Sequence, residues 1–259
     1  MRIVRGVLGV VGELLVTAGV IVLLFVAWQV GYSSLIEGRE QAGIAAQLQQ
    51  ELAQGSTTLP ELPEGPLVPG AAPSLDDGAV IAIIRVPRFG TDWARPVYEG
   101  ISTDVLARGP GHYPRTALPG QVGNMAIAGH RTTHGHPFFD IDALVAGDVI
   151  VIETRTSYAV YRMVRSTIVR PSQSEVVAPV PEKLGAKPTE SWLTLTSCHP
   201  KFSAAQRYIT FAKLDRLVPR TAGPPPELTA APAAAASAPA AAIADPTTWP
   251  VTSFVLGGA

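Results

Sequence analysis

The stretch YAVYRMV at residues 158–164 indicates most directly how this chain folds, because its residues alternate with the period of two typical of a strand. Successive side chains of a strand point to opposite faces of a sheet, and Val and Tyr are enriched there. Similar short runs recur on both sides, separated by turn signals such as Pro-Gly at 119–120 and Gly-Asp at 147–148. The predicted strands are residues 80–86, 94–98, 124–128, 148–153, 158–164, 167–170, 192–196 and 208–212.

Helical patterns are rare in the same region. Only Thr103–Arg108 and Phe138–Val145 favour short helices between residues 76 and 219. About eight strands within about 140 residues indicate an all-β barrel or sandwich. The spacing of the strands does not choose between these two architectures.

A long apolar segment, Val7–Val30, precedes this region, and its 24 residues carry a single charge, Glu13. At about 1.5 Å per residue it spans the roughly 30 Å hydrocarbon core of a bilayer. Arg2 and Arg5 precede the segment, so we expect a cytoplasmic N-terminus and an extracellular chain after Tyr32. A cleaved signal peptide is the alternative. Its apolar region is usually about 7–15 residues long, and no clear cleavage site follows here, so an uncleaved single-pass membrane anchor is predicted.

The segments around the β-rich region differ in composition. Leu35–Gln54 favours helix and is interpreted as a stalk leaving the membrane, and Gly55–Ser74 is a Pro/Gly-rich linker. The predicted division is residues 1–6 as the cytoplasmic N-terminus, 7–30 as the anchor, 31–75 as stalk and linker, 76–219 as the β-rich domain, and 220–259 as a disordered Pro/Ala-rich tail.

Charge and histidine spacing exclude several functions. Residues 76–220 hold 17 basic and 13 acidic side chains with no basic, aromatic-interleaved cluster, so no nucleic acid is expected as a partner. His130 and His134 have the i, i+4 spacing of a zinc pair, but Arg131 stands where the metalloprotease pattern needs a glutamate. The glycines and Pro137 nearby also disfavour the helix that such a pair requires. Acidic residues are too few for a calcium site, so we predict no metal and no cofactor.

Cys198 is the single cysteine, in the segment TLTSCHP at residues 194–200. Exported proteins usually pair their cysteines, so an unpaired one is either a buried bystander or a reactive thiol. Arg207 begins the next predicted strand, and both side chains would line one site if the two strands are neighbours. His130, far upstream after another apolar strand, completes a nucleophile–base arrangement. His199 is disfavoured as the base because adjacent strand residues point to opposite faces.

These motifs resemble those of the sortases, transpeptidases of Gram-positive cell surfaces. Thr194–Cys198 resembles the family's Thr-Leu-x-Thr-Cys signature, except that Ser197 stands where the pattern has Thr. The segment Gly129-His130-Arg131 resembles the histidine motif, and Arg207 matches the family's arginine. The resemblance covers roughly residues 76–219, and His-Tyr-Pro at 112–114 and Cys-His-Pro at 198–200 resemble the actinobacterial class E housekeeping group.

The resemblance implies an eight-stranded β-barrel and a defined reaction. Cys198 would attack the Thr–Gly bond of a surface protein's C-terminal sorting signal and form a thioacyl intermediate. His130 would serve as general acid and then base, Arg207 would stabilise the oxyanion, and an amine of a peptidoglycan precursor would release the joined protein.

Substrate preference and alternative functions complete the expectations. The class E resemblance implies a Leu-Ala-x-Thr-Gly signal rather than Leu-Pro-x-Thr-Gly, with Tyr113 as a candidate pocket contact and Thr196 and Ser197 as further candidates for substrate binding. Tyr113 as a half-buried packing ring is the alternative. The competing functions are a pilin-polymerising sortase, another cysteine peptidase or L,D-transpeptidase, and an inactive barrel that binds sorting signals.

Overall fold

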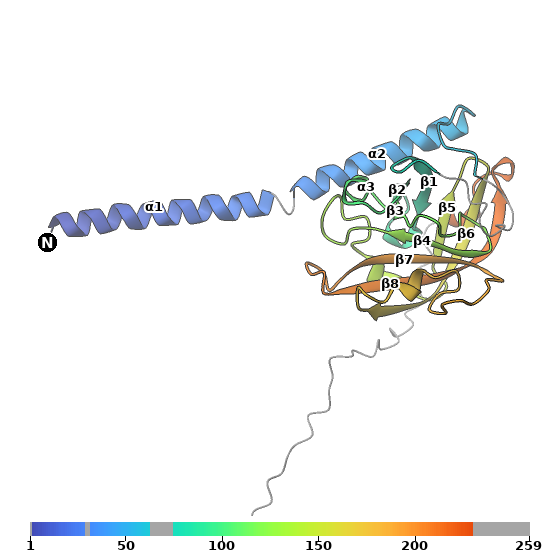
Figure 1. Ribbon diagram of the computed structural model, residues 1–259. Helices are drawn as coiled ribbons and strands as arrows, with labels where there is room; N and C mark the ends of the chain where they lie inside the picture. Colours follow the sequence, from blue (N-terminus) through green and yellow to red (C-terminus); the bar gives the residue numbers. More distant parts are fainter. Residues whose placement is uncertain (1, 29–31, 63–74, 230–259) are drawn as a thin grey trace, which may run out of the picture.

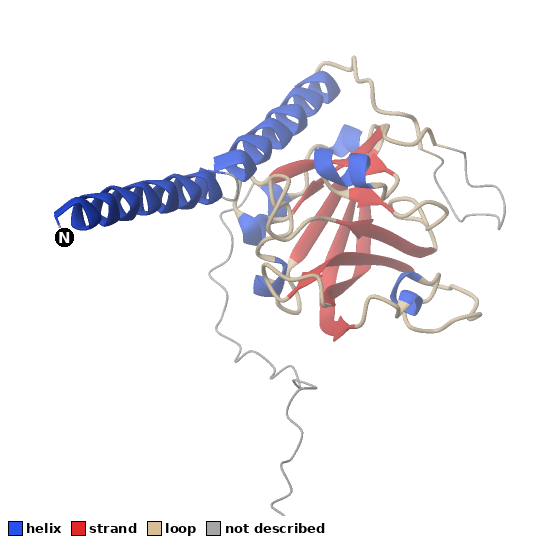
Figure 2. Ribbon diagram, turned by 60° about the vertical axis from the view of Figure 1, so that its left-hand side comes forward, coloured by secondary structure: helices blue, strands red, loops and turns tan. Residues whose placement is uncertain are grey.

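The computed structural model describes residues 2–28, 32–62 and 75–229, whose centre is a closed eight-stranded β-barrel (Figures 1 and 2). Around the barrel the strands follow the order β1-β2-β3-β4-β7-β8-β6-β5. Their bounds are β1 Val80–Arg85, β2 Ala94–Glu99, β3 Gly111–His112, β4 Gly123–Ala128, β5 Val149–Glu153, β6 Ser157–Val169, β7 Ser191–His199 and β8 Gln206–Pro219. The barrel that the resemblance implied is therefore confirmed.

Two of the eight predicted strands are a single strand in the structure, and β7 and β8 extend beyond the predicted 192–196 and 208–212. Residues 158–164 and 167–170 form one strand, β6, whose register shifts at two points along β8, so the polar residues that interrupt the sequence pattern lie within a continuous strand. The two-residue β3 was missed because Gly-His carries no strand pattern. It pairs parallel to β2 and antiparallel to β4.

The helical predictions are partly correct. Thr103–Arg108 is the helix α3, capped by the Ser102 hydroxyl. The segment Phe138–Val145 is not an α-helix and contains only the 3-10 turn η3, Ile141–Ala143. The Phe139 carbonyl, which a helix would use internally, instead accepts a hydrogen bond from the Arg131 side chain.

The barrel core consists of side chains that alternate inward along the strands. In β4 these are Met125 and Ile127, and in β7 they are Leu193 and Leu195, all fully buried. The intervening residues of the two strands therefore face outward. This alternation decides which residues lie beside Cys198.

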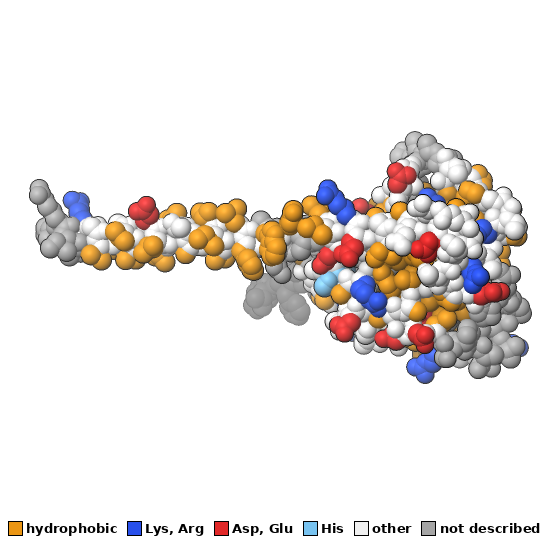
Figure 3. All heavy atoms as spheres, turned by 90° about the horizontal axis from the view of Figure 1, so that it is seen from above, with side chains coloured by type: hydrophobic (Ala, Val, Ile, Leu, Met, Phe, Trp, Pro, Cys, Tyr) orange, Lys and Arg blue, Asp and Glu red, His pale blue; other side chains and the backbone are white. Residues whose placement is uncertain are grey.

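The N-terminal helix α1, Arg2–Ala27, is long and apolar enough over Arg5–Val26 to cross a membrane. Its side chains between these two residues are exposed, and hydrophobic atoms cover the helix along its length (Figure 3). The surface matches the expected anchor.

The predicted stalk is a helix, α2, Ser33–Ala53, but it lies against the barrel above β1 and β2 (Figures 1 and 2). Leu48 and Leu52 pack with Ile83 of β1 and with Leu59, which belongs to the predicted linker. Burying a leucine stabilises a fold by about 1.5–3 kcal/mol. The weak apolar spacing of α2 thus supplies enough buried surface to dock it.

Ordered structure also continues beyond the predicted domain end at residue 219. Arg220 pairs with Glu153 at 2.9 Å, and Glu227 pairs with Arg216 at 2.7 Å. Two 3-10 turns, Arg220–Ala222 and Pro226–Leu228, lie in this stretch. The rest of the predicted tail, 230–259, and part of the predicted linker, 63–74, lie outside the described residues.

Candidate active site

Cys198 and Arg207 are direct cross-strand partners. They face each other in the antiparallel pairing of β7 with β8, with Cys198 next to the end of its strand. Directly opposed residues project from the same face of a sheet with Cβ atoms about 4.5–5.5 Å apart. The cysteine is free and partly exposed. Arg207 Nη1 donates to the carbonyl oxygens of Ala204 and Gln206, both at 3.0 Å, which anchors the guanidinium at the start of β8.

His130 reaches the same place through the parallel pairing of β4 with β7. The last residues of this pairing are Ala128 and Thr196, and His130 and Cys198 each follow two positions later. Two hydrogen bonds continue the contact beyond the last paired residues of the two strands: Gly129 N donates to Thr196 O at 3.1 Å, and Ser197 Oγ donates to Gly129 O at 2.8 Å. The structure thereby sets the segments that carry the three predicted catalytic residues side by side.

The segment carrying His130 is packed too closely to vary freely. A Cβ added at Gly129 would lie 2.6 Å from the Phe138 ring. Only glycine at position 129 therefore leaves room for this ring. The backbone then turns, and Phe138 N donates to His130 O at 3.1 Å. The imidazole is held by a loop that folds back on itself.

Helix α2 covers the far part of this loop. Gln41 is buried, and its Nε2 donates to the His134 carbonyl at 2.9 Å. Gly135 has a φ of +70°, and a Cβ there would lie 2.8 Å from the Gly38 nitrogen. The segment that follows the candidate membrane helix is therefore in contact with the histidine loop.

Burial lowers the pKa of His130 below the usual value of about 6.5, and the neighbouring imidazole of His134 lowers this pKa further. The two ring centroids are 4.7 Å apart. His134 Nδ1 also lies 4.0 Å from Glu37 Oε1, and His130 Nδ1 lies 3.3 Å from Thr133 Oγ1. At neutral pH burial and the neighbouring imidazole therefore favour the uncharged form of His130.

A His134→Gln variant should raise the His130 pKa toward its usual value, because it removes the second ionisable ring. NMR titration of the His130 ring in the full chain measures the change directly. Since protonated His130 is the general acid, a larger protonated fraction should raise kcat/KM at neutral pH. An unchanged His130 pKa in this variant would show that burial alone sets it.

Tyr113 and Thr196, both predicted to bind substrate, touch each other. Tyr113 Oη and Thr196 Oγ1 are 3.1 Å apart, and Thr196 shares the outer face of β7 with Cys198. Behind Tyr113, the buried His112 Nδ1 lies 2.7 Å from Glu99 Oε2, and its Nε2 lies 2.9 Å from Thr116 Oγ1. This buried pair, which the sequence analysis did not single out, braces the loop that presents the phenol.

Ser197 alternates to the other face of β7. Its side chain is buried and bonded to Gly129, so in the structure it ties the nucleophile strand to the histidine segment. Its predicted contact with substrate stays a prediction.

Arg131 is the residue whose role the sequence analysis missed, since it was considered only as an argument against zinc and as part of the histidine motif. Its side chain is 1% exposed and contacts the Cys198 carbonyl, the Phe139 carbonyl and the Asp142 carboxylate. An arginine directly after a histidine, at the end of an apolar strand, was the available signal.

Within the described residues, no group of three or more His, Cys, Asp and Glu side chains could hold a metal ion. The acidic residues considered for calcium have basic partners instead. Asp142 pairs with Arg131, Asp140 with Lys201, Asp148 with Arg88, and Glu153 with Arg220.

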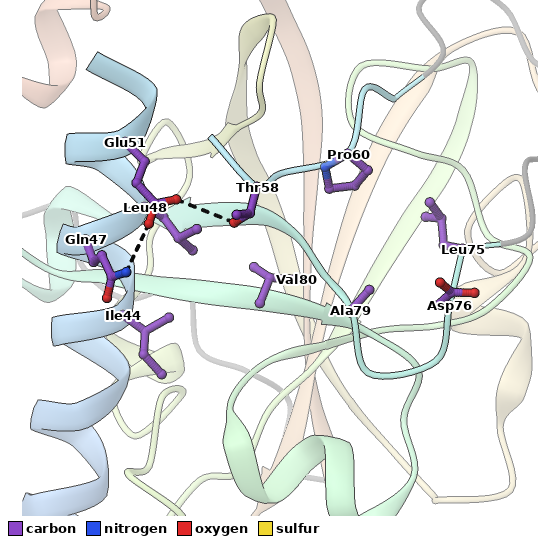
Figure 4. Close-up of a pocket in the computed structure, with 10 residues that line it drawn as sticks. All are labelled: Ile44, Gln47, Leu48, Glu51, Thr58, Pro60, Leu75, Asp76, Ala79 and Val80. Carbon is purple, nitrogen blue, oxygen red and sulfur yellow. Dashed lines mark hydrogen bonds between the residues drawn. The ribbon is translucent and has the colours of Figure 1, made fainter. Parts of the chain in front are cut away.

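A cavity of about 590 Å³ lies elsewhere, between α2, the chain that follows it and the start of β1 (Figure 4). Its lining combines apolar side chains such as Leu48 and Val80 with the acidic Glu51 and Asp76, and a hydrogen bond joins Glu51 to Thr58. None of the predicted site residues lines it, so it is separate from the site at Cys198.

Comparisons with known proteins agree with this geometry. The sortase domain family matches residues 84–215. Sortase SrtE1 of Streptomyces coelicolor is 36% identical over 226 residues, which are 84% of this chain and 60% of that protein's length. Sortase SrtE2 of the same organism is 32% identical over 225 residues, which cover 83% of this chain and 85% of that protein.

Solved structures give the same result. Sortase E from Streptomyces avermitilis matches with a TM-score of 0.55 and 40% identity, over 60% of this chain and 99% of that one. Sortase E1 from Streptomyces coelicolor, solved with a tripeptide in its active site, matches with a TM-score of 0.54 and 38% identity, over 58% of this chain and 97% of that one.

Proposed function

Because this chain belongs to the sortase family, whose members are cysteine transpeptidases, we propose that it cleaves the Thr–Gly bond of a C-terminal sorting signal and joins the protein to an amine of a cell-wall precursor. The observation that carries this proposal is the position of Arg207 directly opposite Cys198, with the segment that carries His130 hydrogen-bonded alongside the same strand. The chain spans 60% of the length of the SrtE1 relative, so the activity rests on the domain that the two share.

The proposed reaction has two halves. The Cys198 thiolate attacks the threonine carbonyl carbon, forming a C–S bond, and the C–N bond to glycine breaks as protonated His130 gives its proton to the leaving amine. The incoming amine then attacks the thioester carbonyl carbon and passes its proton to His130; a new C–N bond forms, and the C–S bond breaks to release the thiolate.

Arg207 supports both halves of the reaction. The developing oxyanion needs a positive donor beside Cys198, and the guanidinium of the cross-strand partner supplies one. Its anchoring through Nη1 to the carbonyls of Ala204 and Gln206 holds the charge in place before substrate arrives. A donor already in position avoids the cost of reorganisation during the reaction.

The location of the enzyme follows from α1. A helix able to span a bilayer, preceded by arginines and followed by the barrel, supports a single-pass protein with an extracellular catalytic domain. This topology places the site where exported surface proteins and peptidoglycan precursors are found. Both are the partners proposed here.

The direct test is ligation by the full chain in detergent micelles. A Leu-Ala-x-Thr-Gly peptide and an excess of a glycine oligomer are incubated with it, and the products are read by mass spectrometry. A ligated product supports transpeptidation, and hydrolysis alone indicates another acceptor. The absence of both, together with an unreactive thiol, would favour an inactive barrel that binds sorting signals.

A Tyr113→Phe variant should lose part of its preference for Leu-Ala over Leu-Pro signals. When the phenol donates to Thr196 Oγ1, its oxygen can accept a hydrogen bond from the alanine N–H, which proline lacks. A neutral hydrogen bond contributes about 0.5–1.5 kcal/mol, so the ratio of kcat/KM values should fall roughly twofold to tenfold.

The matched control for this variant is Tyr158→Phe, because the Tyr158 hydroxyl bonds to Arg220 near the other end of β8. An unchanged ratio in Tyr113→Phe would limit Tyr113 to packing.

A further inference from the structure

A buried guanidinium joins the loop that carries His130 to the strand that carries Cys198. Arg131 Nη1 donates to the Cys198 carbonyl at 3.2 Å, Nε donates to the Phe139 carbonyl at 3.1 Å, and Nη2 pairs with Asp142 Oδ2 at 2.6 Å. The guanidinium carbon also lies 5.5 Å from the centre of the Tyr208 ring. We call Arg131 with the Cys198 carbonyl, the Phe139 carbonyl and Asp142 the Arg131 clamp.

The clamp completes a set of links around the reacting pair. One residue before His130, Gly129 bonds to Thr196 and Ser197, which precede the nucleophile. One residue after His130, Arg131 bonds to the carbonyl of the nucleophile itself. The backbones of His130 and Cys198 are therefore linked on both sides of the pair, and neither can move far without breaking a hydrogen bond.

Burying a charge at this place is costly. A buried ion pair is often no more stabilising than apolar residues of the same volume, whereas removing one partner leaves an uncompensated buried charge. The Arg131 side chain is 1% exposed and that of Asp142 is 43% exposed, so most of the desolvation falls on the arginine. The planar guanidinium of arginine can donate hydrogen bonds to two carbonyls and a carboxylate at the same time, which no other side chain can do in this geometry.

A second contact links the same segments. Lys201, three residues after the nucleophile, places Nζ 3.7 Å from the centre of the Phe139 ring and 3.6 Å from Asp140 Oδ1. Its Nζ is also 3.9 Å from Asp142 Oδ1. The chain on both sides of His199 is thus held to the turn that contains Phe139 and Asp142.

We propose that Arg131 is a positioning residue of the transpeptidation reaction: by holding the Cys198 carbonyl, it fixes the distance and angle between the thiolate and the His130 imidazole. This inference rests on the proposed function for its kinetic part. Misplacing a reacting group by about 1 Å can lower a rate on the order of 100-fold. The expected signature is a loss in kcat with little change in KM, because the substrate contacts assigned above do not include Arg131.

The chain offers a matched control at the other end of β8. Arg220 also donates to a carbonyl, that of Thr154, pairs with a buried carboxylate, Glu153, and lies over a tyrosine ring, Tyr158. The strand between residues 206 and 219 separates it from Arg207 by roughly 40 Å at about 3.3 Å per residue. Arg220→Lys therefore disturbs the same kind of contact without reaching the reacting pair.

The experiment compares Arg131→Lys, Asp142→Asn and Arg220→Lys in the full chain in detergent micelles. Ligation kinetics, thermal unfolding and the rate of Cys198 alkylation by iodoacetamide are measured for each. Arg131→Lys keeps the positive charge but loses the planar set of donors of the guanidinium. It should lower kcat roughly 10-fold to 100-fold, with KM within about twofold of the wild-type value. Asp142→Asn, whose side chain is partly exposed, should fold normally and lower kcat less. Arg220→Lys should stay within about threefold of wild type.

Specific outcomes overturn the inference. Arg131→Lys activity within about twofold of wild type, or an equal loss in Arg220→Lys at a similar change in Tm, would reduce Arg131 to a structural residue. Should Arg131→Lys fail to fold, the kcat, KM and Tm of Asp142→Asn are compared with those of wild type and Arg220→Lys instead. A wild type that ligates nothing refutes the proposed function instead. The alkylation rates then still test the positioning role, because a misplaced thiol should react at a changed rate only in the Arg131 and Asp142 variants.

Discussion

A Cys198→Ala variant should lose ligation and hydrolysis of the sorting peptide completely, by roughly 10⁴-fold or more, because no other side chain in this chain can form the thioacyl bond. Cys198 is the single cysteine, so no second thiol can substitute. Mass spectrometry of the products measures both reactions in one sample. The same instrument should detect a peptide adduct on the wild-type chain and none on the variant.

The variant should remain folded, because the lost sulfur is partly exposed and its backbone contacts to Arg131 and β8 are retained. Circular dichroism and Tm provide the control. Residual activity above about one part in 10³ would contradict the assignment of Cys198 and direct attention to a hydroxyl, with Thr196 the nearest on the same face of β7.

A His130→Gln variant should lower kcat/KM for ligation by roughly 10²-fold to 10⁴-fold, the range that general acid–base catalysis contributes. Glutamine keeps a polar side chain of similar reach but cannot donate and recover a proton at neutral pH. Steady-state kinetics across the pH range measures the loss.

Alkylation separates the two functions of the site in this variant. Cys198 should still react with iodoacetamide, because Arg207 remains its cross-strand neighbour. Ligation within about tenfold of the wild-type rate would show that another group moves the proton. His134, with its ring centroid 4.7 Å from that of His130, is the first to examine.

Local patterns were sufficient for most of the barrel. Strands such as β1 and β4 carry the apolar, β-branched character that a buried sheet requires, and their bounds agree with the predictions within one residue. β3 could not be found, because a two-residue strand is defined by its neighbours and not by its own residues. Phe138–Val145 failed for a related reason, since the Arg131 side chain competes for the carbonyl that a helix needs.

The position of α2 also escaped prediction. Its sequence favours helix, and the helix is present, but nothing in a weakly apolar pattern tells a free stalk from a docked one. The docking depends on a few buried leucines and on the approach of Gly38 to Gly135. Whether α2 docks depends on the barrel surface as well as on the helix, so the sequence of the helix alone does not predict it.

By itself, the sequence determined the chemistry of the site: a lone cysteine, a histidine after one apolar strand and an arginine at the start of another, in an order that resembles the sortases. Only the tertiary structure decided how they are held. The parallel pairing of β4 with β7 sets the segments that carry His130 and Cys198 side by side, and a buried Arg131 links them. Side-chain types are written in the chain, whereas a contact between residues 131 and 198 exists only once the barrel closes and brings them together.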